Sequence, residues 1–105
     1  MSEFVQVGQK KDFPENQAIR IEVNGCSICI VNEKGSLYAF DDHCTHAEAS
    51  LSGGDIEEGQ VTCPLHGARF SIKTGEPLTL PAVKPVTIHE VKVEGENVFV
   101  KLKDL

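Results

Sequence analysis

Two short segments of the chain each pair a cysteine with a histidine, and no other feature limits the possible folds as strongly. The first is Cys44-x-His46 in "DDHCTHAEAS", and the second is Cys63-x-x-His66 in "CPLHGARF". Thiolate and imidazole are common transition-metal ligands, whereas a lone cysteine is most often a small buried hydrophobe. Because both segments are rich in turn-forming residues, the matched pairs predict a metal centre held between two loops.

Two kinds of metal centre use two cysteines and two histidines. A zinc site of this composition usually has two to four residues between its cysteines and three to five between its histidines. Here each short spacing joins a cysteine to a histidine, and like ligands lie far apart. That order suits a 2Fe-2S centre of the Rieske type, in which two cysteines hold one iron and two histidines hold the other. Zinc remains the alternative.

The motif "CTH", followed after 16 residues by "CPLH", resembles the signature of Rieske proteins. The resemblance implies one 2Fe-2S cluster, with Cys44 and Cys63 on one iron and His46 and His66 on the other. Three further residues are expected close to the cluster. Gly67 lets the backbone approach it without a Cβ clash, and the other two would cover it from solvent: Leu65 and Pro81.

The segment "AFDDHCTHAEASLSGG" is similar to the ferredoxin components of bacterial aromatic-ring-hydroxylating dioxygenase systems, which usually carry glycine where this chain has Ala47. The resemblance implies a cytoplasmic, monomeric one-electron carrier that docks transiently with a flavin-dependent ferredoxin reductase and a terminal oxygenase. The small Rieske-like subunit of a larger reductase, such as assimilatory nitrite reductase, is the alternative. An oxygenase is not expected, because its mononuclear iron needs two further histidines and a carboxylate, whereas His43 and His89, the two that remain, lie in regions with no such motif, and 105 residues leave no room for a catalytic domain.

Neutral imidazoles in place of thiolates raise the reduction potential, over a range of about −150 to +300 mV. High-potential Rieske proteins add a disulfide between the two loops and hydroxyl donors near the cluster. The matching positions here are Ala49 and Leu65, and Ala68 and Phe70, none of which can do so. We therefore expect a potential near the low end, around −150 mV to within about 0.1 V.

The rest of the pattern predicts an all-β fold. "AIRIEV" (18–23) alternates apolar and polar residues, and Asn24-Gly25 is a strong hairpin signal before "CSICIV". A second turn leads into "LYAF" (37–40), and two strands are expected around Gly95, Glu96 and Asn97. We expect one domain of 105 residues: an antiparallel β-sandwich base, 1–40 and 82–105, with a loop-rich cluster-binding insertion at about 41–81.

A formal net charge of −6 argues against a nucleic-acid partner, and no apolar run is long enough to span a membrane. The N-terminus has no secretory signal pattern. Six acidic residues flank the predicted cluster and fit either a solvated loop or a docking rim for a basic partner: Asp41, Asp42, Glu48, Asp55, Glu57 and Glu58.

Cys26 and Cys29 form a C-x-x-C motif within a predicted strand, where residues three apart point to opposite faces. We therefore interpret both as structural thiols rather than as a redox pair or a second metal site. His43 lies outside the signature and is expected to be exposed, and His89 is expected on a strand, facing solvent or an edge.

Overall fold

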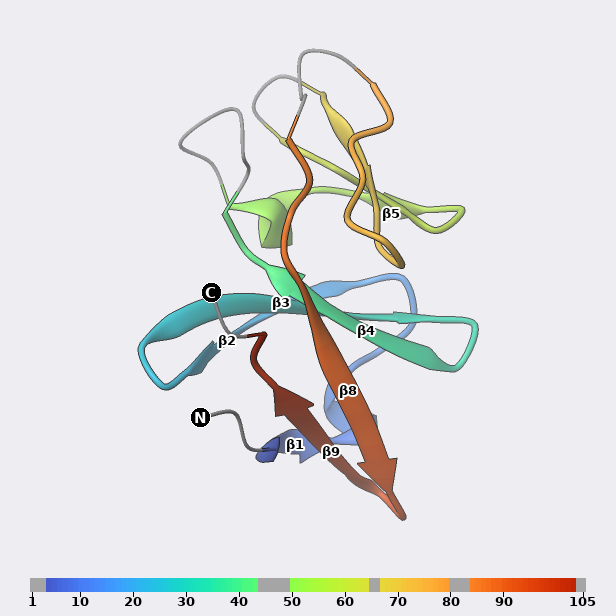
Figure 1. Ribbon diagram of the computed structural model, residues 1–105. Helices are drawn as coiled ribbons and strands as arrows, with labels where there is room; N and C mark the ends of the chain where they lie inside the picture. Colours follow the sequence, from blue (N-terminus) through green and yellow to red (C-terminus); the bar gives the residue numbers. More distant parts are fainter. Residues whose placement is uncertain (1–3, 44–49, 65–66, 80–83, 104–105) are drawn as a thin grey trace.

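The computed structural model describes residues 4–43, 50–64, 67–79 and 84–103, which form two antiparallel sheets (Figure 1). The described elements, in chain order, are β1 Phe4–Gln9, η1 Lys10–Asp12, β2 Ala18–Val23, β3 Cys26–Glu33, β4 Ser36–Asp41, η2 Leu51–Gly53, β5 Ile56–Glu57, β6 Gln60–Thr62, β7 Arg69–Ser71, β8 Ile88–Glu94 and β9 Asn97–Lys101. Both η elements are single 3-10 turns. The expected all-β fold is confirmed.

The larger sheet has six strands in the order β1-β9-β8-β4-β3-β2. Its two edge strands, β1 and β2, also contact each other, so the sheet curls almost into a barrel around its own core. β8 pairs with β9 through Glu90–Glu94 and with β4 through Ile88 and His89. β8 therefore joins the β1-β9 part of the curled sheet to the β4-β3-β2 part (Figure 1).

The hairpin turn predicted between β2 and β3 is confirmed. Asn24 and Gly25 have φ of 49° and 83°, the left-handed values that a type I′ turn needs at both central positions. The same arrangement recurs at Lys34-Gly35 between β3 and β4, and at Glu58-Gly59 between β5 and β6. These turns set the register of three hairpins, β2–β3, β3–β4 and β5–β6.

β3 lies between two apolar cores. Ile28 and Ile30 face the core inside the curled sheet, while Cys29 and Val31 face a second core between this sheet and the smaller one. Side chains of a strand alternate between its faces, so a strand with a core on each side reads as a continuous apolar run. This explains "CSICIV", in which residues 28–31 are all fully buried.

The smaller sheet, β5-β6-β7, was not predicted, because it lies within the segment that we expected to be loop-rich. Val61 and Phe70 pair across β6 and β7, and both are fully buried against the larger sheet. The Glu33 carboxylate of β3 accepts a hydrogen bond from the backbone N–H of Gly59, which ties the two sheets together. Cys63 directly follows β6 of this smaller sheet.

Candidate metal centre

Cys63 follows β6 directly, and it is fully buried. Of the four predicted ligands, it alone falls within the part of the chain that the structure describes. The remaining predicted ligands and covering residues lie outside the described residues: Cys44, His46, His66, Leu65 and Pro81. The described part of the site is Cys63 together with the residues that flank 44–49, 65–66 and 80–83 in the chain.

The loop after Cys63 is closed by its own backbone. The N–H of Cys63 donates to the carbonyl of Ala68 over 2.7 Å, and the N–H of Gly67 donates to the carbonyl of Cys63 over 3.0 Å. Gly67 has a φ of 74°, and no described atom lies within 4 Å of the place its Cβ would occupy. Glycine is favoured here because the loop needs a left-handed backbone. Cys63 is thus joined by backbone hydrogen bonds to both Gly67 and Ala68.

The surroundings of Cys63 are apolar. Ala68, Phe70 and Leu51 belong to the same core cluster and are fully buried. Neither Ala68 nor Phe70 has a side-chain donor. A buried thiol at the mouth of a closed turn, without a disulfide partner, fits a cysteine ligand of a metal cluster shielded from water. The two-cysteine, two-histidine donor set fits a Rieske cluster in the same way.

The first loop is closed at its base by pairing between its two ends. His43 and Ser50 form an isolated antiparallel bridge, and the N–H of Leu51 donates to the carbonyl of Asp42 over 2.6 Å. The side chain of His43 is exposed, as predicted. Residues 44–49, which include Cys44 and His46, thus begin and end at adjacent points of the backbone.

Gly54, which follows η2, passes close to the end of β6. A Cβ on Gly54 would lie 1.7 Å from the carbonyl oxygen of Thr62, the residue before Cys63. The N–H of Thr62 donates to the carbonyl of Asp55 over 2.9 Å. The segment after η2 and the residue before Cys63 are therefore in direct backbone contact, which only a residue without a side chain permits.

Similar contacts flank the segment that contains Pro81. The N–H of Leu78 donates to the carbonyl of Arg69 over 2.7 Å, and the N–H of Val86 donates to the carbonyl of Gly75 over 2.9 Å. A Cβ on Gly75 would lie 2.2 Å from the carbonyl oxygen of Val86. Residues 80–83 are therefore bounded by segments anchored to the smaller sheet.

The expectation that His89 faces solvent or an edge is wrong. His89 is 7% exposed, its Nε2 lies 2.8 Å from Oδ1 of Asp41, and its Nδ1 accepts the N–H of Lys103 over 2.9 Å. Because Nδ1 accepts, Nε2 carries the proton and donates to Asp41. Alternation along β8 placed the residue on the correct strand, but its partners come from β4 and from the segment after β9, which a local pattern does not reveal.

Cys26 and Cys29 are separated as predicted, one exposed and one buried. Burial raises the pKa of the Cys29 thiol well above its usual range, and the negative charge of Asp42 raises it further. An un-ionised, buried thiol is a poor nucleophile and a poor ligand. Among the residues that the structure describes, no three His, Cys, Asp or Glu side chains form a group that could hold a metal ion.

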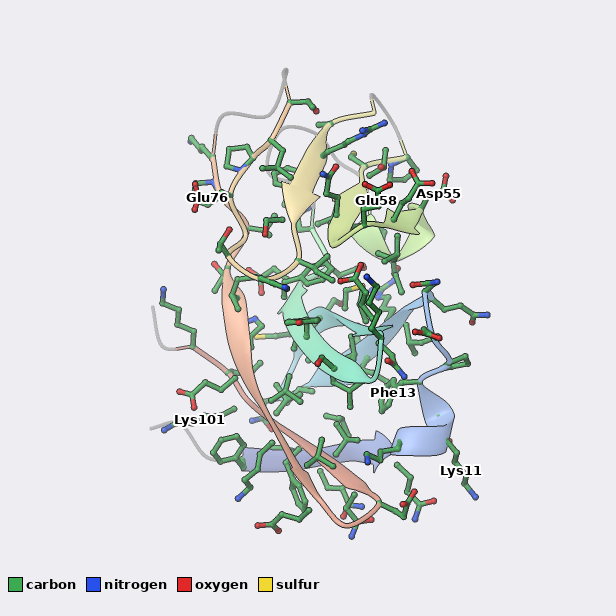
Figure 2. All side chains as sticks on the ribbon, turned by 90° about the vertical axis from the view of Figure 1, so that its right-hand side faces the viewer. Lys11, Phe13, Asp55, Glu58, Glu76 and Lys101 are labelled. Atoms are coloured by element: carbon green, nitrogen blue, oxygen red, sulfur yellow. The ribbon has the colours of Figure 1, made fainter. Side chains whose placement is uncertain are left out.

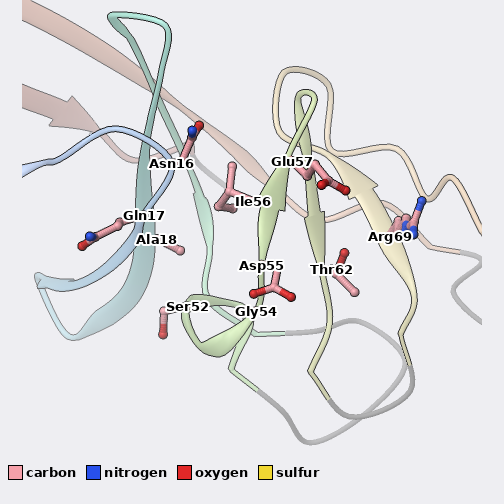
Figure 3. A pocket seen from close by; sticks show the side chains of 10 residues that line it. All are labelled: Asn16, Gln17, Ala18, Ser52, Gly54, Asp55, Ile56, Glu57, Thr62 and Arg69. Carbon is pink, nitrogen blue, oxygen red and sulfur yellow. The ribbon is translucent and has the colours of Figure 1, made fainter.

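A groove of about 600 Å³ runs between the 16–18 segment and the smaller sheet (Figure 3). Its charged lining residues are two carboxylates, Asp55 and Glu57, and one guanidinium, that of Arg69. These side chains lie on the outer side of the smaller sheet, and they present no convergent set of donors aimed at one point. Neither helical turn in the described part of the chain approaches the length and apolarity of a membrane-spanning helix.

The family model for the Rieske [2Fe-2S] domain matches residues 3–100 of this sequence. The chain therefore belongs to the Rieske family. Its cofactor is accordingly one Rieske-type 2Fe-2S cluster. Within the family, the chain is similar to ferredoxin components of dioxygenase systems, which carry electrons and are not themselves enzymes.

Three relatives illustrate this similarity. The 3-phenylpropionate/cinnamic acid dioxygenase ferredoxin subunit of Shigella boydii serotype 4 (strain Sb227) is 44% identical over 94 residues, 89% of this chain and 88% of the relative. The ferredoxin of carbazole 1,9a-dioxygenase from Nocardioides aromaticivorans IC177 superposes with a TM-score of 0.89 at 33% identity, over 92% of this chain and 95% of the other. A ferredoxin solved in complex with the oxygenase of carbazole 1,9a-dioxygenase gives 0.88 at 31% identity, over 92% and 91% of the two chains.

Proposed function

We propose that this chain is the ferredoxin of an aromatic-ring dioxygenase system and carries single electrons from a flavin-dependent reductase to a terminal oxygenase. The observation that carries the proposal is the 44% identity to a dioxygenase ferredoxin subunit across 89% of the chain. A Rieske cluster supplies the chemistry by accepting one electron and releasing it again. The relatives favour this role over that of a small subunit of a nitrite reductase, because those named above are ferredoxins.

The proposed ligands are Cys44 and Cys63 for one iron, and His46 and His66 for the other. Support comes from the burial of Cys63 and from the closed turn behind it. The proposed division of the chain is a base of 1–40 and 82–105 that carries a cluster-binding insertion at about 41–81. In this arrangement the contact between Gly54 and Thr62 joins the chain segments next to the two ligand loops. A disulfide between the loops is not possible, because Ala49 and Leu65 stand in place of its two cysteines.

The proposed reduction potential is low for a Rieske centre, around −150 mV to within about 0.1 V. Ala68 and Phe70, beside Cys63, are fully buried and offer no hydroxyl. The N–H groups of Cys63 and Gly67 already donate to backbone carbonyls within the loop. Fewer hydrogen bonds to the cluster leave its more negative, reduced state less stabilised. A redox titration followed by circular dichroism measures this potential, and a midpoint above about +100 mV would contradict the reasoning.

The proposed docking region is the acidic part of the molecule around the smaller sheet. Figure 2 shows Asp55, Glu58 and Glu76 there, all exposed, and Lys11 and Lys101 toward the other end of the molecule. These exposed carboxylates would attract basic surfaces of a partner to a monomeric carrier and raise the association rate at low salt. A cytoplasmic location fits the described cysteines, which are all without disulfides.

Iron and sulfide analysis with EPR spectroscopy tests the ligand assignment. The purified protein should contain two irons and two sulfides per chain and give a Rieske-type signal after reduction with dithionite. Replacing Cys44 or Cys63 by serine, or His46 or His66 by glutamine, should abolish that signal. Cys26→Ser and His43→Gln are matched controls, because both side chains are exposed, and both should retain the signal. Zinc without sulfide would overturn the assignment.

Electron transfer is tested with the oxygenase of a 3-phenylpropionate dioxygenase system, mixed anaerobically with the reduced protein. The expected result is oxidation of this chain in step with reduction of the oxygenase, slowing as salt is raised. An intact cluster that exchanges no electrons with any aromatic-ring oxygenase tested would contradict the partner assignment while leaving the cluster assignment standing.

A further inference from the structure

The carboxylate of Asp42 is buried at the base of the first loop, with only 4% of the residue exposed. Its Oδ1 accepts the backbone N–H of Ser52 over 2.8 Å, and its Oδ2 accepts a short hydrogen bond from the hydroxyl of Ser50. Arg20 on β2 lies at the same oxygen, with Nε 3.6 Å from Oδ2. Burial of a carboxylate is costly unless hydrogen bonds and opposite charge compensate for it, and here three groups do so.

The backbone of Asp42 is bound as firmly as its side chain. Its N–H donates to the carbonyl of Ser27 on β3 over 3.2 Å, and its carbonyl accepts the N–H of Leu51 over 2.6 Å. One residue is thus attached to the larger sheet on one side and to the far end of the first loop on the other. The side-chain and backbone contacts together span residues 50–52.

These contacts bracket residues 44–49 on both sides. The segment lies between His43 and Ser50, and Ser50 pairs with His43 and donates its hydroxyl to Asp42. In an asparagine the amide nitrogen would replace one of the two carboxylate oxygens, and a nitrogen can accept neither the Ser52 N–H nor the Ser50 hydroxyl proton and has no negative charge to face Arg20. The carboxylate is therefore the side chain that accepts from both Ser50 and Ser52 while it pairs with Arg20.

We propose that Asp42 is the positioning residue of the first ligand loop: its carboxylate fixes both ends of the loop so that Cys44 and His46 reach the cluster in one geometry. The inference rests on the proposed ligand assignment. It gives Asp42 a role toward the cluster that is exerted through the loop and does not require direct contact with the cluster.

The test compares Asp42→Asn with Asp41→Asn in the cluster-loaded protein. Both remove one negative charge at neighbouring positions, but Asp41 is partly exposed and binds His89, and an asparagine there can still accept from Nε2. Iron release to excess bathophenanthroline should be about tenfold faster in Asp42→Asn, as for changes in the groups that orient metal ligands. Its EPR signal should also broaden or shift. Asp41→Asn should release iron at the wild-type rate with an unchanged signal.

Ser50→Ala provides a second variant should Asp42→Asn fail to fold. It removes one of the hydrogen bonds and keeps the buried charge, so iron release should be faster than in the wild type, with a change of the EPR signal in the same direction. Arg20→Gln should change release by less than about twofold, since the pair is long at 3.6 Å and the Arg20 side chain is 54% exposed to water.

Three results would overturn the proposal. A loaded Asp42→Asn protein with the wild-type release rate and signal would do so and leave the proposed function intact. Equal effects of Asp41→Asn and Asp42→Asn would assign the change to charge alone and refute positioning. Wild-type protein without iron and sulfide would overturn both the positioning role and the proposed function.

Discussion

Replacing Gly54 by alanine places a methyl group where the structure has no room. The added Cβ would lie 1.7 Å from the carbonyl oxygen and 2.9 Å from the carbonyl carbon of Thr62. Since an ordinary carbon–oxygen contact is about 3.3 Å or longer, the two backbones would have to separate by roughly 1.6 Å. Gly54 has φ −92° and ψ 171°, which any residue adopts, so the conflict is one of space alone.

The expected cost is large because no side-chain rotation can relieve it. Overpacking usually costs about 1–3 kcal/mol, and a clash between backbone segments belongs at or above the upper end, about 3 kcal/mol. For a domain of this size each kcal/mol corresponds to about 4–8 °C in Tm, so a fall of roughly 12 °C or more is expected. Displacement of Thr62 also moves Cys63, so the visible absorbance of the cluster should be lost before the sheets unfold.

Gly53→Ala is the matched control, one residue away. The nearest atom to its added Cβ is Cγ of Pro64 at 3.8 Å, an ordinary contact, and its φ is not in the left-handed region. Alanine at such a site stabilises by about 0.4–1 kcal/mol, so the two variants should differ in sign. Thermal scans at one rate, followed by far-UV circular dichroism and by cluster absorbance, measure both. A Gly54→Ala protein as stable as Gly53→Ala would refute a rigid backbone contact between the loops.

His89→Ala should cost about 1–3 kcal/mol, since it leaves the Lys103 N–H without its acceptor; the Lys103 amide should then exchange faster by NMR, and unchanged exchange would contradict the assigned bond. The raised pKa of Cys29 means that above about pH 8.5 the unfolded chain ionises this thiol while the folded chain keeps it protonated. Stability present below that pH is thus lost as pH rises, by up to about 1.4 kcal/mol per unit, and Cys29→Ala should flatten this slope in urea titrations. Iodoacetamide should modify exposed Cys26 in the native protein and spare Cys29, and peptide mapping that finds Cys29 modified would disprove its burial.

The predicted strands were those whose signals are local. The alternation in "AIRIEV" gave the bounds of β2, Ala18–Val23, without error, and Asn24-Gly25 gave the turn that follows it. The C-terminal hairpin was predicted for the same reason, since its turn glycine, Gly95, stands between two apolar segments. Each of these elements is specified by the order of residues within it, so a pattern of a few residues is sufficient to predict it.

The elements that were missed depend on distant partners. β5, β6 and β7 have only two or three residues each, too few to establish a period of two. β1 is paired with β9 at the other end of the chain, and no local turn announces it. His89 was placed correctly on a strand but assigned the wrong surroundings, because its hydrogen-bond partners, Asp41 and Lys103, lie far from it in the sequence.

The candidate site divides in the same way, between what binds and what holds the binding residues in place. The proposed ligands follow from residue type and spacing, and both can be read directly from "CTH" and "CPLH" in the sequence. The described contacts that close the loops join Asp42 to Ser50, Gly54 to Thr62 and Gly75 to Val86. Aspartate, serine and glycine also fill ordinary exposed turns, so their types alone do not distinguish a clamp from a solvated loop. Burial makes the distinction: a carboxylate with 4% exposure, and glycines whose Cβ would overlap a carbonyl, are tolerated only where the surrounding backbone must keep one arrangement.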